Sequence, residues 1–256
     1  MTPLRSIRTW LARAAGAALL VACSSATTAQ VPGPRAEPAR APASGAPRTA
    51  PPAAPRDDGE SAPLIAGLSR LETDILVEMN RARRDPRGYA DLLERRLRHY
   101  EGNILRLPGQ TPIRTEEGPA AVREAIRVLR GLQPVAPLGH APGLSRAARD
   151  HVRDQGRRGT TGHRGSDGSS ASDRVSRHGA WDVSVAENIA YGPATGREVV
   201  IGLIVDDGVP NRGHRTTIFD PTLRVAGAAC GEHRGYGTMC VVNYAGVFAE
   251  GQRAGK

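Results

Sequence analysis

The sequence has few aromatic residues, a single lysine and no long hydrophobic run. Aromatic side chains make up 4% of the 256 residues, and the 20 prolines and 30 glycines leave little material for a large core. No apolar stretch reaches the roughly 18 residues that a membrane-spanning helix needs, so we do not expect an integral membrane protein. Cysteine occurs only three times, which limits the chain to one intramolecular disulfide.

The formal net charge of +9 would by itself suggest a nucleic-acid partner. However, Lys256 is the only lysine, so nearly all of the positive charge is arginine, and the chain is also rich in Ala, Gly and Pro. We interpret this pattern as a compositional bias rather than a basic face. We therefore expect no nucleic-acid partner.

The first 29 residues have the order of regions that is typical of a secretory signal peptide. Three arginines precede an apolar run over residues 14–22, and small and hydroxylated residues follow at 24–29. Residues 20–23, Leu-Val-Ala-Cys, also resemble a bacterial lipobox in which Cys23 is lipidated, and the alternative is cleavage after Ala29. Both readings place the protein outside the cytoplasm, either lipid-anchored at the cell envelope or secreted. Membrane contact is expected only through the signal peptide or the lipid anchor.

Residues 30–63 are rich in proline and alanine and have almost no large apolar side chains. Such a segment cannot bury enough surface to offset its ordering entropy, so it is predicted to be a disordered tether. A folded domain is expected over residues 64–250, with a short tail at 251–256.

Helical and strand patterns alternate irregularly along this domain, which predicts an α+β fold rather than a doubly wound parallel sheet. Residues 102–117 and 160–170 are expected to be loops. The predicted helices are 64–84, 86–97 with Asp85 as its N-cap, 119–132, 144–155, 172–178 and 199–205, and the predicted strands are 184–191, 225–230 and 238–245.

Cys230 and Cys240 lie on the last two predicted strands, which a polar turn at residues 234–236 would join as a hairpin. In that register the two cysteines face each other at a Cα separation that a disulfide can bridge. Export favours oxidation, so we expect a disulfide, with two buried free thiols as the alternative.

Three segments carry a family resemblance. They read T-G-H-R-G-S-D-G at 161–168, A-E-N-I-A-Y-G at 186–192 and G-H-R-T-T-I-F-D-P at 213–221, and N-R-A-R at 80–83 adds a fourth match. In this order they resemble the CAP superfamily, or SCP-like domain, of cysteine-rich secretory proteins, antigen five and pathogenesis-related proteins, in its bacterial secreted branch. The resemblance covers about residues 64–248. Asn80 and Arg83 are expected to be structural, tying the first helix to neighbouring segments.

The resemblance implies a three-layer α-β-α sandwich around an antiparallel sheet, with a cleft of two histidines and two acidic residues. His163 and His214 match the two histidines, and Glu187 matches the first glutamate. Asp206 lies nearest the position of the second glutamate, and Asp207 is the alternative. Several members of the family bind zinc or another divalent cation in this cleft, so His163 and His214 are candidate metal ligands.

Three functions are compatible with these residues. The first is a binding module at the envelope whose metal-holding cleft takes a lipid, glycan or protein ligand. The second is a metal-dependent hydrolase that uses water activated by His163, His214 and Glu187, with Glu187 as the catalytic residue. The third is an arginine-driven binder of anionic envelope polymers. The structural alternative for the cleft is a hydrogen-bonded network that Arg215 and Asp167 would join.

Overall fold

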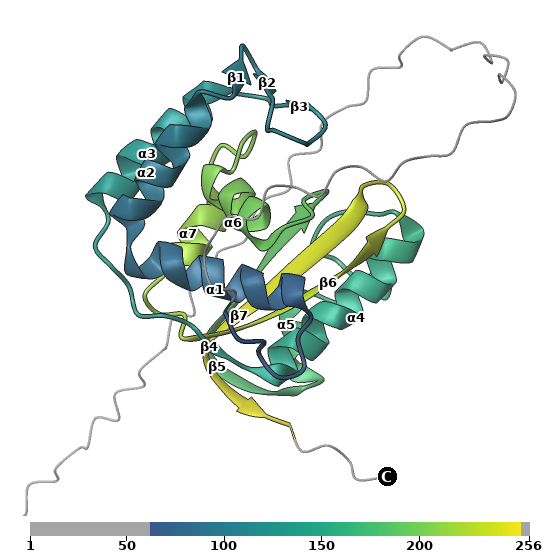
Figure 1. Cartoon of the computed structure of the whole chain (residues 1–256). Helices are drawn as coiled ribbons and strands as arrows, with labels where there is room; N and C mark the ends of the chain where they lie inside the picture. Colours follow the sequence, from purple (N-terminus) through teal and green to yellow (C-terminus); the bar gives the residue numbers. More distant parts are fainter. Residues whose placement is uncertain (1–61, 252–256) are drawn as a thin grey trace, which may run out of the picture. The chain divides into compact units, whose positions relative to one another are not determined.

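The computed structural model describes residues 62–251 (Figure 1). The predicted signal peptide, the lipidation of Cys23, and nearly all of the predicted tether and C-terminal tail lie outside the described residues. Within residues 62–251, no helix is both long enough and apolar enough to cross a membrane.

The elements follow one another as an α+β chain. The helices are α1 (Arg70–Arg84), α2 (Pro86–Leu97), α3 (Pro119–Gly131), α4 (Pro142–Arg158), α5 (Ala171–Ser176), α6 (Gly196–Val205) and α7 (Gly213–Phe219). The strands are β1 (Tyr100–Glu101), β2 (Ile104–Leu105), β3 (Ile113–Arg114), β4 (Gly139–His140), β5 (Gly179–Tyr191), β6 (Val225–His233) and β7 (Gly237–Glu250).

The start of α2 agrees with the prediction, and the start of α1 does not. The Asp85 side chain accepts a hydrogen bond from Gly88 N, and Pro86 begins α2 as predicted. The expected start of the first helix at residue 64 was wrong. Ser69 and Glu72 form a capping box that begins α1 at Arg70, so the apolar residues before it are not helical.

The main sheet has the strand order β4-β6-β7-β5 and is mixed rather than antiparallel. The pairs β5–β7 and β6–β7 are antiparallel, as predicted, but β4 runs parallel to β6. The prediction missed this short strand because two residues carry no periodic pattern. The chain leaves β4 through helices before it returns in β6, and such a crossover permits parallel pairing.

Helices cover both faces of this sheet, which gives three layers (Figure 1). Helices α4 and α5 lie on one face, and α1, α6 and α7 lie on the other, with α2 and α3 packed together beyond them. Alternate residues of β6 and β7 therefore contribute to buried apolar clusters on opposite faces of the sheet. Helix α4 approaches the sheet closely at Gly227, where a Cβ atom would collide with the backbone nitrogen of Ser145.

Three sets of contacts hold the segments around the sheet in place. Cys230 and Cys240 are directly paired on β6 and β7 and form a disulfide, which confirms the prediction. Arg83 is fully buried and donates to backbone carbonyls of Ala136, Ile218, Asp220 and Leu223. Asn80 exchanges two hydrogen bonds with the backbone of Leu138. The structural roles predicted for Asn80 and Arg83 are confirmed.

Candidate functional site

The first predicted pair of site residues, His163 and Glu187, is in direct contact. His163 lies in the loop after α4, and its Nδ1 is 3.0 Å from Glu187 Oε1 on β5. The loop is held from below, because Gly162 O accepts hydrogen bonds from His151 Nε2 at 2.9 Å and from Gln155 Nε2 at 2.8 Å. The His163 side chain is 55% exposed, whereas the Glu187 side chain is 2% exposed. The imidazole is therefore held at the surface by a buried carboxylate.

Further donors surround the carboxylate of Glu187. Arg174 on α5 donates from Nη2 to Glu187 Oε2 at 2.7 Å, and its own side chain is 2% exposed. Asn243, opposite Glu187 on β7, reaches the same oxygen at 3.1 Å when its amide nitrogen faces the carboxylate. Burial raises the pKa of Glu187, but the hydrogen bond from His163 and the charge of Arg174 outweigh it and leave the pKa below its usual value. Glu187 is therefore ionised, with both oxygens occupied.

The second pair, His214 and Asp206, is built at the junction of two helices. Asp206 ends α6 in the left-handed conformation, with φ 56°, and its side chain is 2% exposed. Its Oδ1 lies 2.6 Å from His214 Nδ1, and its Oδ2 accepts a hydrogen bond from His214 N at 2.9 Å. Asp206 thus orients the His214 ring and also caps the first turn of α7. The His214 side chain is 25% exposed.

Strand β5 links the two pairs. Glu187 and Asn188 are consecutive on this edge strand, so their side chains point to opposite faces of the sheet. Glu187 meets His163, and Asn188 donates from Nδ2 to the backbone oxygen of His214 at 3.1 Å. No group of three or more His, Cys, Asp or Glu side chains with metal-binding geometry occurs among residues 62–251. The predicted cleft residues therefore form two pairs beside one strand rather than a single cluster.

In both pairs the carboxylate accepts a hydrogen bond, so the proton of each neutral imidazole resides on Nδ1. Neither His163 Nε2 nor His214 Nε2 has a hydrogen-bond partner in the described part of the chain. Each ring thus keeps one unengaged nitrogen lone pair. This is the arrangement by which carboxylates orient histidine ligands of metal ions.

The other residues considered for the site lie elsewhere. Asp207, the alternative to Asp206, accepts hydrogen bonds from the backbone nitrogens of Glu116 and Glu117. Arg215 pairs with Glu124, and Asp167 pairs with Arg177. The expectation that Arg215 and Asp167 would join the histidine network is therefore wrong, because nearer partners of opposite charge engage both.

Sequence reasoning missed Arg174 and His151. Arg174 balances the charge of Glu187, and the buried His151 supports the loop that carries His163. Arg174 is hidden among the many arginines of the chain, and only its place in the short helix after the loop distinguishes it. His151 lies within the predicted helix 144–155, but the sequence gave no indication of its hydrogen bond to the loop.

A family comparison supports the resemblance seen in the sequence. The model of the CAP family, the cysteine-rich secretory protein family, matches residues 123–244. The chain is a CAP-domain protein. The matched segment begins in α3, ends in β7 and contains both histidine–carboxylate pairs. Helices α1 and α2 precede it, although the resemblance seen in the sequence extends over them.

Three solved structures of bacterial proteins are similar to parts of the chain. An outer surface protein of Borrelia burgdorferi is 17% identical, with a TM-score of 0.36, over 43% of this chain and 78% of that one. An extracellular SCP-domain protein of Bacillus anthracis is 19% identical, with a TM-score of 0.36, over 47% of this chain and 36% of that one. A cysteine-rich secretory protein of Staphylococcus aureus is 11% identical, with a TM-score of 0.33, over 54% and 42%.

The chain thus spans less than half of the Bacillus and Staphylococcus proteins. The three structures are described as outer-surface, extracellular and secretory proteins. No curated protein matches the chain.

Proposed function

We propose that this CAP-domain protein is an exported binding module, lipid-anchored through Cys23 or secreted, in which His163 and His214 are ligands for divalent cations. One observation carries the proposal. Each imidazole is fixed through Nδ1 by a carboxylate that is 2% exposed, while its Nε2 has no partner among residues 62–251. Export is supported by the signal-like order of residues 1–29.

The donor set fits zinc or a similar divalent ion. Neutral imidazole nitrogen is a preferred zinc ligand, and His163 and His214 would each supply one. Glu187 and Asp206 would act on the far ring nitrogens and increase the basicity of the ligands. A bound cation would supply a positive centre with open positions, which an oxygen atom of a lipid, glycan or protein ligand fills.

The state of Glu187 favours binding over hydrolysis. A general base needs a carboxylate oxygen that can reach a water molecule. The Oε1 of Glu187 is occupied by His163, and its Oε2 is occupied by Arg174. The lowered pKa of Glu187 further weakens it as a base. We therefore assign Glu187 a positioning role and rank the metal-dependent hydrolase second.

Calorimetric titration of the full chain with zinc tests the proposal. We expect His163→Ala and His214→Ala each to weaken zinc binding by at least about tenfold, because a metal-bound imidazole is lost. His178→Ala is the matched control. This histidine also pairs with a carboxylate, Asp150, at 2.7 Å, but lies outside the two pairs. Zinc uptake that persists in the double variant of His163 and His214 would refute the metal site.

A peptidase and esterase screen on the same samples separates the two functions. For a binding module we expect no turnover above that of the double variant. Zinc-dependent turnover that is lost in Glu187→Gln while circular dichroism shows this variant to be folded would instead support the hydrolase.

A further inference from the structure

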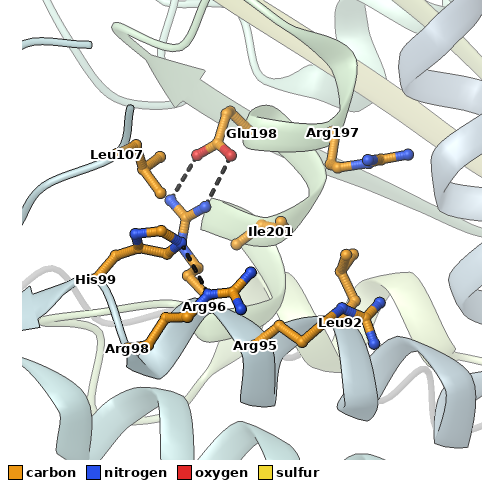
Figure 2. Close-up of a pocket in the computed structure, with 9 residues that line it drawn as sticks. All are labelled: Leu92, Arg95, Arg96, Arg98, His99, Leu107, Arg197, Glu198 and Ile201. Atoms are coloured by element: carbon orange, nitrogen blue, oxygen red, sulfur yellow. Dashed lines mark hydrogen bonds and ion pairs between the residues drawn. The ribbon is translucent and has the colours of Figure 1, made fainter. Parts of the chain in front are cut away.

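A pocket lies away from the histidine pairs, between α2 and the first turns of α6. It has a volume of about 190 Å³ and shares no residue with the two pairs (Figure 2). Its wall from α2 and the following turn carries Leu92, Arg95, Arg96, Arg98 and His99. The opposite wall is made by Arg197, Glu198 and Ile201 of α6, with Leu107 at the side.

The pocket lining is strongly cationic, with four arginines against one glutamate. Arg96 forms a two-pronged ion pair with Glu198, which occupies the only carboxylate of the lining (Figure 2). Arg197 contacts Glu78 at 3.2 Å. Arg95 and Arg98 are exposed, and neither has a carboxylate partner within the described residues. Two positive charges at the pocket therefore lack a balancing acid.

The excess positive charge of α2 is concentrated on the side that faces the pocket. Its acidic residues Asp91 and Glu94 both lie against Arg130 of α3, so they are directed away from the pocket. Cations near the end of α2 are favoured by the helix dipole, which accounts in part for Arg95. The same dipole disfavours Arg197 in the first turn of α6. The helix dipole therefore does not explain why arginines of both α2 and α6 line this pocket.

The shape of the pocket limits the ligand. A volume of about 190 Å³ is smaller than the ~300–1,000 Å³ of pockets that enclose drug-sized molecules, so one compact charged group fits. Planar guanidinium groups match the oxygens of a phosphate, which brings close to two negative charges and three acceptors. The apolar side chains Leu92, Leu107 and Ile201 suit the carbon atoms next to such a group.

We propose that this pocket, formed by Arg95, Arg96, Arg98 and Arg197, binds a phosphate monoester. The ester is carried either by a small soluble molecule or by a lipid headgroup. The guanidinium groups of Arg95 and Arg98 bind the phosphate oxygens. The Arg96–Glu198 ion pair connects α2 to α6 and keeps the two walls of the pocket in place. This inference goes beyond the proposed metal site and does not depend on it.

Two probes and two double variants of the full chain test the proposal. The probes are glycerol 3-phosphate, measured by calorimetry, and phosphatidylcholine vesicles with or without phosphatidic acid, measured by co-sedimentation. Arg95→Gln with Arg98→Gln removes the two unpaired cations. Arg123→Gln with Arg127→Gln is the control, because it removes two exposed arginines of α3 that also have no ion-pair partner among residues 62–251.

We expect the pocket variant to weaken phosphate-ester binding by about tenfold or more, because charge-assisted hydrogen bonds are lost, and the control to change it by less than about twofold. Binding of glycerol 3-phosphate with this pattern identifies a soluble ester, and binding only to phosphatidic acid vesicles identifies a headgroup. Equal weakening by both double variants, or no binding of either probe to the wild type, would overturn the proposal. Zinc uptake should be unchanged in the pocket variant, so the two sites can fail separately.

Discussion

The two histidine–carboxylate pairs have the same local geometry but differ in how their charge is balanced. Glu187 shares its carboxylate between His163 and the buried Arg174, so the negative charge on that side already has a permanent partner. The only ion-pair partner of Asp206 in the described part of the chain is His214. The second pair therefore keeps more negative charge available for a cation. The Glu187–His163 pair is thus mainly a structural support, whereas the Asp206–His214 pair is an electrostatic site.

The largest predicted effect is the loss of stability in Glu187→Gln. The amide can still accept the hydrogen bond from His163, but it leaves the Arg174 guanidinium, which is 2% exposed, without a counter-charge. Removing one partner of a buried ion pair costs about 3–5 kcal/mol. Urea unfolding of the variant measures this loss in the free energy of unfolding.

The double variant Glu187→Gln with Arg174→Met is the matched control for this effect. It removes both charges, so it should be more stable than Glu187→Gln alone. A single variant that unfolds at the wild-type urea concentration would mean that Arg174 finds solvent or another partner.

Asp206→Asn should lower the free energy of unfolding by a smaller amount, about 1–2 kcal/mol. The change weakens the hydrogen bonds to the ring and to the backbone nitrogen of His214, but it leaves no buried arginine unpaired. Asparagine tolerates the left-handed conformation of this position, whereas Asp206→Ala adds a backbone penalty of about 1 kcal/mol.

Urea unfolding of the wild type, Glu187→Gln and Asp206→Asn ranks the two losses in the free energy of unfolding. A cost for Asp206→Asn that equals or exceeds the cost for Glu187→Gln would remove the contrast between the two pairs.

A local signal made the start of α2 predictable, although the local capping box that begins α1 was overlooked. Asp85 and Pro86 set the start of α2 from adjacent positions, and the sequence predicted it correctly. Helix α7 was missed because its first turn is capped by Asp206, which lies eight residues before His214 and outside any local pattern. Strand β4 was missed because two residues carry no periodicity, and its pairing depends on β6, far along the chain.

The same distinction holds for the candidate site. The family segments identified His163, Glu187 and His214, and the structure brings each histidine against a carboxylate. The pairing of Asp206 rather than Asp207 with His214 depends on where α6 ends, which the sequence left open. Arg174 could not be singled out, because burial of one arginine among many is a tertiary property.

The smallest predicted effect is a loss of stability at acid pH that acts on the His163–Glu187 pair through His151. Burial lowers the pKa of His151, although the charge of Glu187 opposes this shift. The unfolded chain, with an ordinary histidine pKa of about 6.5, therefore binds the proton first as the pH falls. Stability is lost from about that pH downward to the lower folded pKa, because ∂ΔG/∂pH is positive where the unfolded state holds more protons. The loss should amount to a few degrees in Tm between pH 7 and pH 5.

The acid effect should be local, since His151 supports Gly162 next to His163 and lies far along the chain from the residues around His214. Hydrogen-exchange protection of amides 160–165 should fall between pH 7 and pH 5 more than that of amides 206–214. His151→Gln keeps an amide donor for Gly162 O without a titrating ring, so it should reduce the pH dependence. His140 also has a pKa lowered by burial but contacts Ser145 instead, so His140→Gln should leave the protection of 160–165 unaltered. If both segments lost protection equally, the two pairs would share one acid response and the contrast between them would not extend to pH.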